Sequence, residues 1–122
     1  MREPEKLKAF QLADRLALDI YRATKGFPKS EQYGLVAQMR RAAVSTASNI
    51  VEGCARNGEA DYLRFLDMAY GSVCELQYQV SLAVRLELLS ASEGQALTSG
   101  CRQTAKFLNA LICALRRSTA SA

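Results

Sequence analysis

Apolar residues recur along most of the chain at alternating spacings of three and four, which is the period of a helix with one buried face. The stretch GFPKS, which begins at Gly26, interrupts this period, and Ser30 is placed to cap the next helix. EGCARNG interrupts the period again, and Ser90 with Glu93 has the spacing of a capping box. The pattern therefore predicts four helices, at about residues 4–25, 31–52, 59–88 and 91–117.

The third periodic segment is the longest, and it has the most regular apolar seam, from Tyr62 to Ala83. The fourth segment repeats this spacing from Leu97 to Leu115. Near-heptad seams on helices joined by short loops are typical of antiparallel bundles. We therefore expect one all-α domain over residues 1–122, folded as an up-down-up-down four-helix bundle.

The third helix also carries apolar side chains away from its core seam. They lie about 80 to 160 degrees around the helix from that seam. A bundle cannot bury every side of one of its own helices, so we expect this cluster to contact other copies in a ring-like homo-oligomer. The alternative is a set of tolerated surface apolar residues. The expected contact residues are Leu63, Tyr70, Cys74, Tyr78 and Leu82.

Composition indicates a globular protein without a membrane span. Apolar residues make up 49% of the chain and charged residues 23%. The beginning, MREPEKLKAF, has no apolar segment of a signal peptide, and the weakly charged residues 68–84 are too polar to cross a membrane. We expect a cytoplasmic protein whose four cysteines are reduced, with Cys113 as the one exposed thiol.

The sequence lacks the residues and motifs on which most enzyme classes depend. There is no histidine, no Gly-rich phosphate loop before a helix, and no pair of cysteines spaced as zinc ligands. We therefore expect no catalytic residues, no cofactor and no metal.

The basic residues are organised more clearly. The net charge is +4, and no acid follows Glu93. Four cations of the last helix fall within an arc of about 100 degrees opposite its apolar seam. Such a stripe suits phosphate, although a solvated face is the alternative reading. The expected nucleic-acid contacts are Arg102, Lys106, Arg116 and Arg117, together with Arg56 from a loop.

The stretch RRAAVSTASNIVEG, residues 40–53, carries many small and polar side chains within an expected helix. Small side chains allow another backbone to approach closely, so the stretch predicts a tight packing surface with a polar network, whereas a ligand site is the sharper alternative. Glu75 is the only charge in residues 68–84, and we expect Arg40 or Arg41 to pair with it, so that Glu75→Ala destabilises the fold more than Glu31→Ala. The expected network is Arg40, Arg41, Asn49, Glu52 and Glu75.

The segments FPKSEQYGLVAQMRRAAVSTASNIVEGCAR and EADYLRFLDMAYGSVCELQYQV resemble the bacterial four-helix-bundle family encoded in intervening sequences of large-subunit ribosomal RNA genes. The resemblance covers about residues 7–117. Ala47 departs from it, because the family usually has proline there, which bends a helix. The matching motif positions are Tyr33, Gly34, Arg40, Arg41, Ser45, Ser48, Asn49, Glu52, Gly53, Phe65, Gly71, Ser72 and Glu75.

This resemblance implies a ring of five copies and a role in binding nucleic acid, and it supplies no catalytic residues. A related branch serves as the accessory protein of diversity-generating retroelements, where a basic pentamer works with a reverse transcriptase and RNA. Our leading hypothesis is a non-enzymatic oligomer that binds RNA or DNA. The rival is a protein scaffold that docks an enzyme such as a reverse transcriptase.

Overall fold

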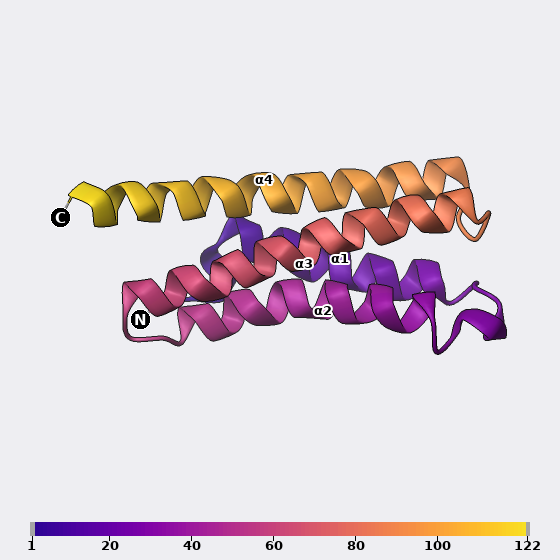
Figure 1. Cartoon of the computed structure of the whole chain (residues 1–122), viewed down its shortest axis with the longest axis horizontal. Helices are drawn as coiled ribbons and strands as arrows, with labels where there is room; N and C mark the ends of the chain where they lie inside the picture. Colours follow the sequence, from indigo (N-terminus) through magenta and orange to yellow (C-terminus); the bar gives the residue numbers. More distant parts are fainter. Residues whose placement is uncertain (1, 122) are drawn as a thin grey trace.

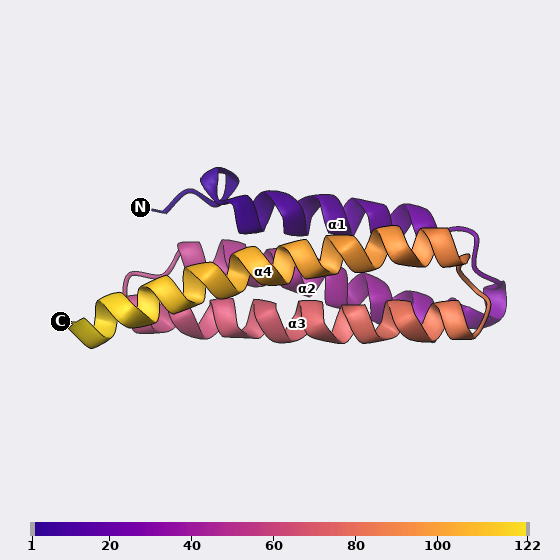
Figure 2. The same cartoon turned by 90° about the horizontal axis from the view of Figure 1, so that it is seen from above.

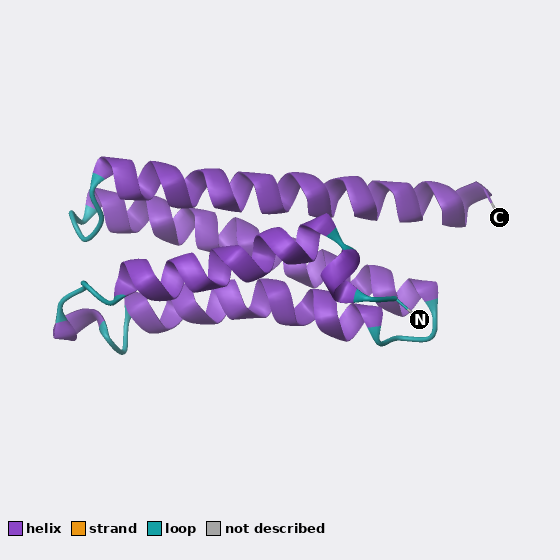
Figure 3. Ribbon diagram, turned by 180° about the vertical axis from the view of Figure 1, so that it is seen from behind, coloured by secondary structure: helices purple, strands orange, loops and turns teal. Residues whose placement is uncertain are grey.

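The computed structural model describes residues 2–121, with the side chains of residues 2–118, and every regular element within them is a helix (Figure 3). The predicted all-α class is confirmed. Two short 3-10 turns precede the first two long helices. The elements are η1 (Pro4–Lys6), α1 (Lys8–Thr24), η2 (Lys29–Glu31), α2 (Leu35–Cys54), α3 (Glu59–Arg85) and α4 (Ala91–Ser121).

The four long helices run alternately up and down as a bundle (Figure 1). Each helix packs against the helices before and after it in the chain, and α1 also packs against α4. Both termini therefore lie at one end, where α4 extends past the start of α1 (Figure 1, Figure 2). Assembly into a ring remains a prediction.

Two helices begin later than the hydrophobic period indicates. Leu7 is extended, with φ −88° and ψ 126°, so α1 begins at Lys8 rather than Pro4. The turn Lys29–Glu31 is separated from α2 by Gly34, whose φ and ψ are −106° and −110°. Ser30 lies inside that turn and does not cap α2, so its expected role was wrong. The hydrophobic spacing continues through such breaks because it reports which side chains face the core. It does not report backbone angles, so it does not locate the end of a helix.

The connection between α3 and α4 also differs from the expectation. α3 ends at Arg85, and Glu87 has a φ of 62°, the left-handed conformation that ends many helices. α4 has 31 residues against 27 in α3, so α4, and not α3, is the longest helix. The predicted capping box is confirmed, because Glu93 N–H donates to Ser90 Oγ at 3.1 Å and Ser90 N–H to Glu93 Oε1 at 2.9 Å.

The core follows the predicted seam most closely on α3, where every seam residue from Tyr62 to Ala83 is buried. On α4 the predicted Leu111 is only half-buried, and its neighbour Ile112 is 2% exposed. In a straight helix, positions seven residues apart differ by about 20 degrees in direction. Over several heptads this drift moves the core-facing position from one residue to its neighbour.

Polar groups in this core are almost all satisfied within their own helix. Thr24, Thr46 and Thr104 are buried, and each hydroxyl donates to the carbonyl four residues earlier at 2.8 Å. Among the described residues, Gln79 Oε1 is the one buried side-chain acceptor without a partner. Within the same residues, no helix has the length and apolar character needed to cross a membrane.

Candidate nucleic-acid interface

The outer side of α4 carries the predicted stripe of cations. Arg102 and Lys106 are exposed, and neither makes an ion pair within the part of the chain that the structure describes. No acidic residue follows Glu93 on this helix. Both charges are therefore available to a polyanion without first breaking an internal contact.

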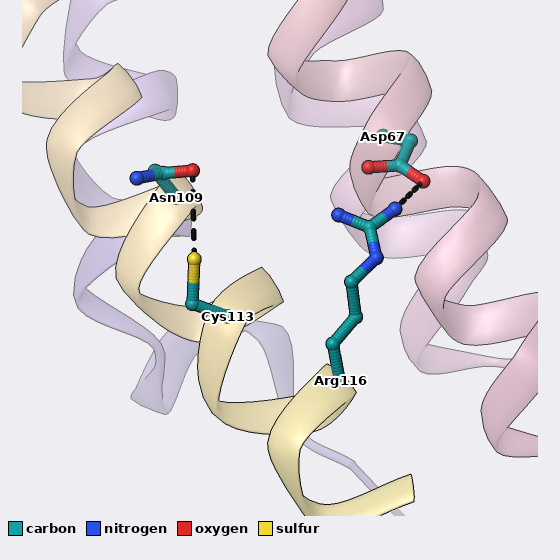
Figure 4. A network of polar contacts seen from close by, with 4 residues as sticks. All are labelled: Asp67, Asn109, Cys113 and Arg116. Atoms are coloured by element: carbon teal, nitrogen blue, oxygen red, sulfur yellow. Dashed lines mark hydrogen bonds and ion pairs between the residues drawn. The ribbon is translucent and has the colours of Figure 1, made fainter. Parts of the chain in front are cut away.

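The carboxyl-terminal part of the stripe is less simple. Arg116 Nη2 donates to Asp67 Oδ2 of α3 at 2.5 Å, so one of the four predicted cations is matched by a carboxylate (Figure 4). Both side chains are about half exposed, and an ion pair of this kind contributes about 0.2–1 kcal/mol. Arg117 is exposed. The same helix holds Cys113, whose Sγ lies 3.8 Å from Asn109 Oδ1 (Figure 4).

Arg56 follows the end of α2 and is held by its neighbours. Its guanidinium lies 3.8 Å from Glu52 Oε1 and 4.9 Å from the centre of the Phe65 ring, and its backbone carbonyl accepts from Arg2 Nη1 at 2.7 Å. The helix dipole also favours a cation near the carboxyl end of a helix. These contacts give Arg56 a local structural role beside any contact with phosphate.

A cleft between α3 and α4 brings Arg102 together with residues from the other helix. Its volume is about 700 Å³, and its lining includes Cys74, Tyr78, Arg85 and Arg102. Sequence reasoning missed Arg85. It follows Tyr78 by seven residues, so the helical period alone could have placed both on one side of α3.

The polar stretch of α2 mainly joins helices. Arg40 Nε donates to Thr24 Oγ1 at 2.9 Å, Nη2 donates to Tyr21 O at 3.3 Å, and the guanidinium lies 4.5 Å from the centre of the Tyr21 ring. Arg40 thus binds the carboxyl-terminal turn of α1, where a cation is favoured. Its neighbour Arg41 points elsewhere and is exposed.

Small residues of the same stretch bring α2 close to α3. Ser45 Oγ lies 2.9 Å from Ser72 Oγ, and Asn49 Nδ2 donates to Ser45 O at 2.8 Å and Ser45 Oγ at 3.0 Å. A Cβ on Gly53 would lie 3.0 Å from Phe65 Cβ and 3.4 Å from a backbone carbonyl. The motif therefore has a packing explanation at each of these positions.

Glu75 does not form the expected ion pair within the chain. It is exposed, and it shares only the lining of a cavity of about 160 Å³ with Arg41. Arg40 is unavailable because α1 binds it. Glu31, which we expected to matter less, is half-buried, and its Oε1 accepts from Leu35 N–H at 3.4 Å at the start of α2. From these contacts we now expect Glu31→Ala to destabilise the fold more than Glu75→Ala.

The predicted contact residues of α3 divide into two groups. Leu63 and Leu82 are half-buried, whereas Tyr70 is 37% and Tyr78 60% exposed. Cys74 and Tyr78 line the cleft with α4, and Leu82 with Tyr78 lines a groove toward α2. Contact of these residues with other copies stays a prediction.

Burial separates the four thiols, all of which are free. Cys54 and Cys101 are buried, and desolvation raises the pKa of Cys101 to about 12. Cys74 is the exposed one and Cys113 only half-exposed, so the expectation for Cys113 was wrong. Among the described residues, no three histidine, cysteine, aspartate or glutamate side chains gather as metal ligands.

The family model described as 23S rRNA-intervening sequence protein matches residues 5–110. The chain belongs to this family. Its fold is also that of a solved structure titled as a protein of unknown function from the S23 ribosomal protein family of Bacteroides thetaiotaomicron. The two share 20% identity with a TM-score of 0.80 over 85% of this chain and 97% of that chain. No curated protein matches the chain closely enough to count as a relative.

Proposed function

We propose that this intervening-sequence protein is a non-enzymatic, cytoplasmic oligomer that binds RNA or DNA through phosphate contacts. The observation that supports it is the acid-free outer side of α4, where Arg102 and Lys106 are exposed and unpaired among the described residues. Contacts of this kind give affinity without reading sequence. Arg117 is also exposed, and Arg116 and Arg56 are ion-paired with Asp67 and Glu52.

Assembly is the second part of the proposal. Exposed apolar side chains lie outside the cleft with α4: Met68 of α3 at 45%, Tyr70 of α3 at 37%, and Leu86, the residue that follows α3, at 54% exposure. Exposed apolar side chains on more than one side of a helix favour contact between copies. A pentamer follows only from the family resemblance. Light scattering after size exclusion tests it: a monomer at micromolar concentration would contradict the contact, and a tetramer would contradict only the number.

A gel-shift titration against RNA and DNA at several salt concentrations tests the binding. We expect the affinity to fall steeply with salt, by about 0.9 in the logarithmic slope for each phosphate contact on duplex DNA. Unrelated sequences should bind about equally, because phosphate contacts carry no sequence information. Binding that is absent at low salt would contradict the proposal.

The second candidate is a scaffold that docks an enzyme such as a reverse transcriptase. It is favoured by the same exposed apolar residues, which serve a protein partner as well as a second copy. Gene neighbourhood separates the two at little cost. A gene inside a ribosomal RNA locus favours the first function, and one beside a reverse transcriptase favours the second.

A further inference from the structure

The second half of α3 and the first half of α4 form a cleft, and the two helices are in close contact at its base. A Cβ on Gly94 would lie 2.2 Å from Val84 Cγ2, so the Val84 side chain fills the space beside Gly94, and both residues line the cleft. The volume of about 700 Å³ is within the range of about 300–1,000 Å³ for ligand sites. The bundle thus has a concave surface at the start of its cationic helix.

The charges of this cleft are of one sign. Among the described residues its lining holds two arginines, Arg85 and Arg102, and no carboxylate. Arg85 Nε donates to the Ser81 carbonyl at 3.3 Å, and neither arginine makes an ion pair within the described chain. A guanidinium group can donate two parallel hydrogen bonds to phosphate oxygens. The cleft therefore presents two side chains that can bind phosphate.

An aromatic ring accompanies these charges. Tyr78 is 60% exposed, and the Arg85 guanidinium lies 5.9 Å from its ring centre. Because the guanidinium lies over one face of the ring, a base would stack on the other face, with Arg85 nearby to bind a phosphate of the same strand. Neutral groups that both donate and accept hydrogen bonds, such as Gln95 and Thr98, complete the lining and suit base edges or sugar hydroxyls.

From this combination we infer that the α3–α4 cleft binds single-stranded nucleic acid, with Arg85 and Arg102 on phosphates and Tyr78 stacked on an unpaired base. The inference rests on the proposed function and names its site. A duplex can use the two cations, but its paired bases are not free to stack on a side chain. The cleft therefore gives a preference for single strands that the stripe on α4 alone does not give.

The test measures fluorescence anisotropy of labelled oligouridylate and of a duplex RNA of equal length, over a range of salt concentrations. Tyr78→Leu should weaken single-strand binding about tenfold, leave duplex binding within about twofold, and keep the salt slope. Arg85→Gln should weaken binding of both RNAs and lower the single-strand slope by about 0.7, the value of one lost phosphate contact.

Matched variants separate the cleft from general effects. Tyr33→Leu removes another exposed ring, at 89% exposure, and Arg22→Gln removes an arginine of α1; both should bind like the parent. Tyr78→Phe should keep most of the affinity, whereas Arg85→Lys should keep the salt slope, because the charge remains, but lose the paired contact of the guanidinium. Circular dichroism and elution volume check that each variant keeps its helices and its assembly.

The outcomes are distinct. Failure of the parent to bind either RNA overturns the proposed function and the cleft with it. A parent that binds, with Tyr78→Leu no weaker than Tyr33→Leu or equally weaker for duplex and single strand, overturns the cleft alone. A changed elution volume for Tyr78→Leu assigns the ring to the contact between copies and also overturns the cleft.

Discussion

The two neighbours of α3 meet it in different ways. Toward α2, polar side chains are used inside the protein: Ser45 and Ser72 join the helices, and Gly53 allows them to touch. Toward α4, the helices touch at Gly94 and then leave a cleft where Arg85 and Arg102 have no ion-pair partner among the described residues. A polar motif can thus serve packing, while the residues free for a ligand lie outside that motif.

The largest effect should come from filling the α2–α3 contact. Gly53→Val places side-chain atoms where a Cβ alone would be 3.0 Å from Phe65 Cβ, so the helices must separate. We expect the free energy of unfolding to fall by about 3 kcal/mol, the upper part of the range for overpacking. Urea denaturation measures it.

Gly71→Val is the matched control, because nothing lies within 4 Å of a Cβ at that position of α3. We expect a change within about 0.5 kcal/mol. Equal effects of the two substitutions would show that the close approach at Gly53 does not stabilise the bundle.

The adjacent arginines of α2 give the next contrast. Arg40→Ala loses the hydrogen bonds to Thr24 and Tyr21 O and the contact with the Tyr21 ring, so we expect a loss of about 1.5–2 kcal/mol. Arg41→Ala removes an exposed arginine and should stay within about 0.5 kcal/mol. Denaturation midpoints that move together would remove the distinction between a structural and a surface arginine.

On the α4 side the effect should appear in binding and not in stability. The double substitution Arg102→Ala with Lys106→Ala should weaken nucleic-acid binding about tenfold and lower the salt slope on duplex DNA by about 1.8, two phosphate contacts at 0.9 each. Thermal unfolding and elution volume should stay unchanged.

Arg15→Ala with Arg22→Ala removes the same number of charges from α1, where both arginines lie near Asp19. This control should bind like the parent. If the two double variants bind alike at every salt concentration, the α4 stripe is only a solvated face, and the scaffold function becomes the better one.

The smallest contrast concerns two acids. Glu31→Ala should cost about 0.5–1 kcal/mol, because its carboxylate accepts from Leu35 N–H at the start of α2. Glu75→Ala should stay within about 0.5 kcal/mol, because Glu75 is exposed. A larger loss for Glu75 that disappears on dilution would place its partner on another copy.

Sequence periodicity predicted the seam of α3 residue by residue, because a helix turns by a nearly fixed angle and each seam position faces the same neighbours. It did not predict the extended Leu7 or the turn before Gly34, since backbone breaks leave the hydrophobic order unchanged. The hydrogen bond between Arg40 and Thr24 could not be predicted from the pattern of one helix, because it depends on how α1 and α2 pack against each other.

The candidate site was predicted in part. Arg102 and Lys106 were found from their own helical wheel, whereas Arg85 belongs to a cleft that exists only when two helices are placed side by side. Cys74, a predicted contact residue between copies, also lines that cleft. The pattern along one helix identifies the residues that share a face of that helix. The groups that this face contacts are known only once the helices are packed together.

The unequal lengths of α1 and α4 have a consequence for motion. α4 has 31 residues, about 46 Å, and α1 has 17, about 25 Å, so α4 runs on past the start of α1 (Figure 2). Amide hydrogens of residues 113–118 should exchange with solvent faster than those near Cys101 and Leu108, because Leu115 is the one residue of this range that packs against the core. Arg116 and Arg117 lie on this segment, so we expect slower exchange there to report a bound polyanion before any change in melting temperature does.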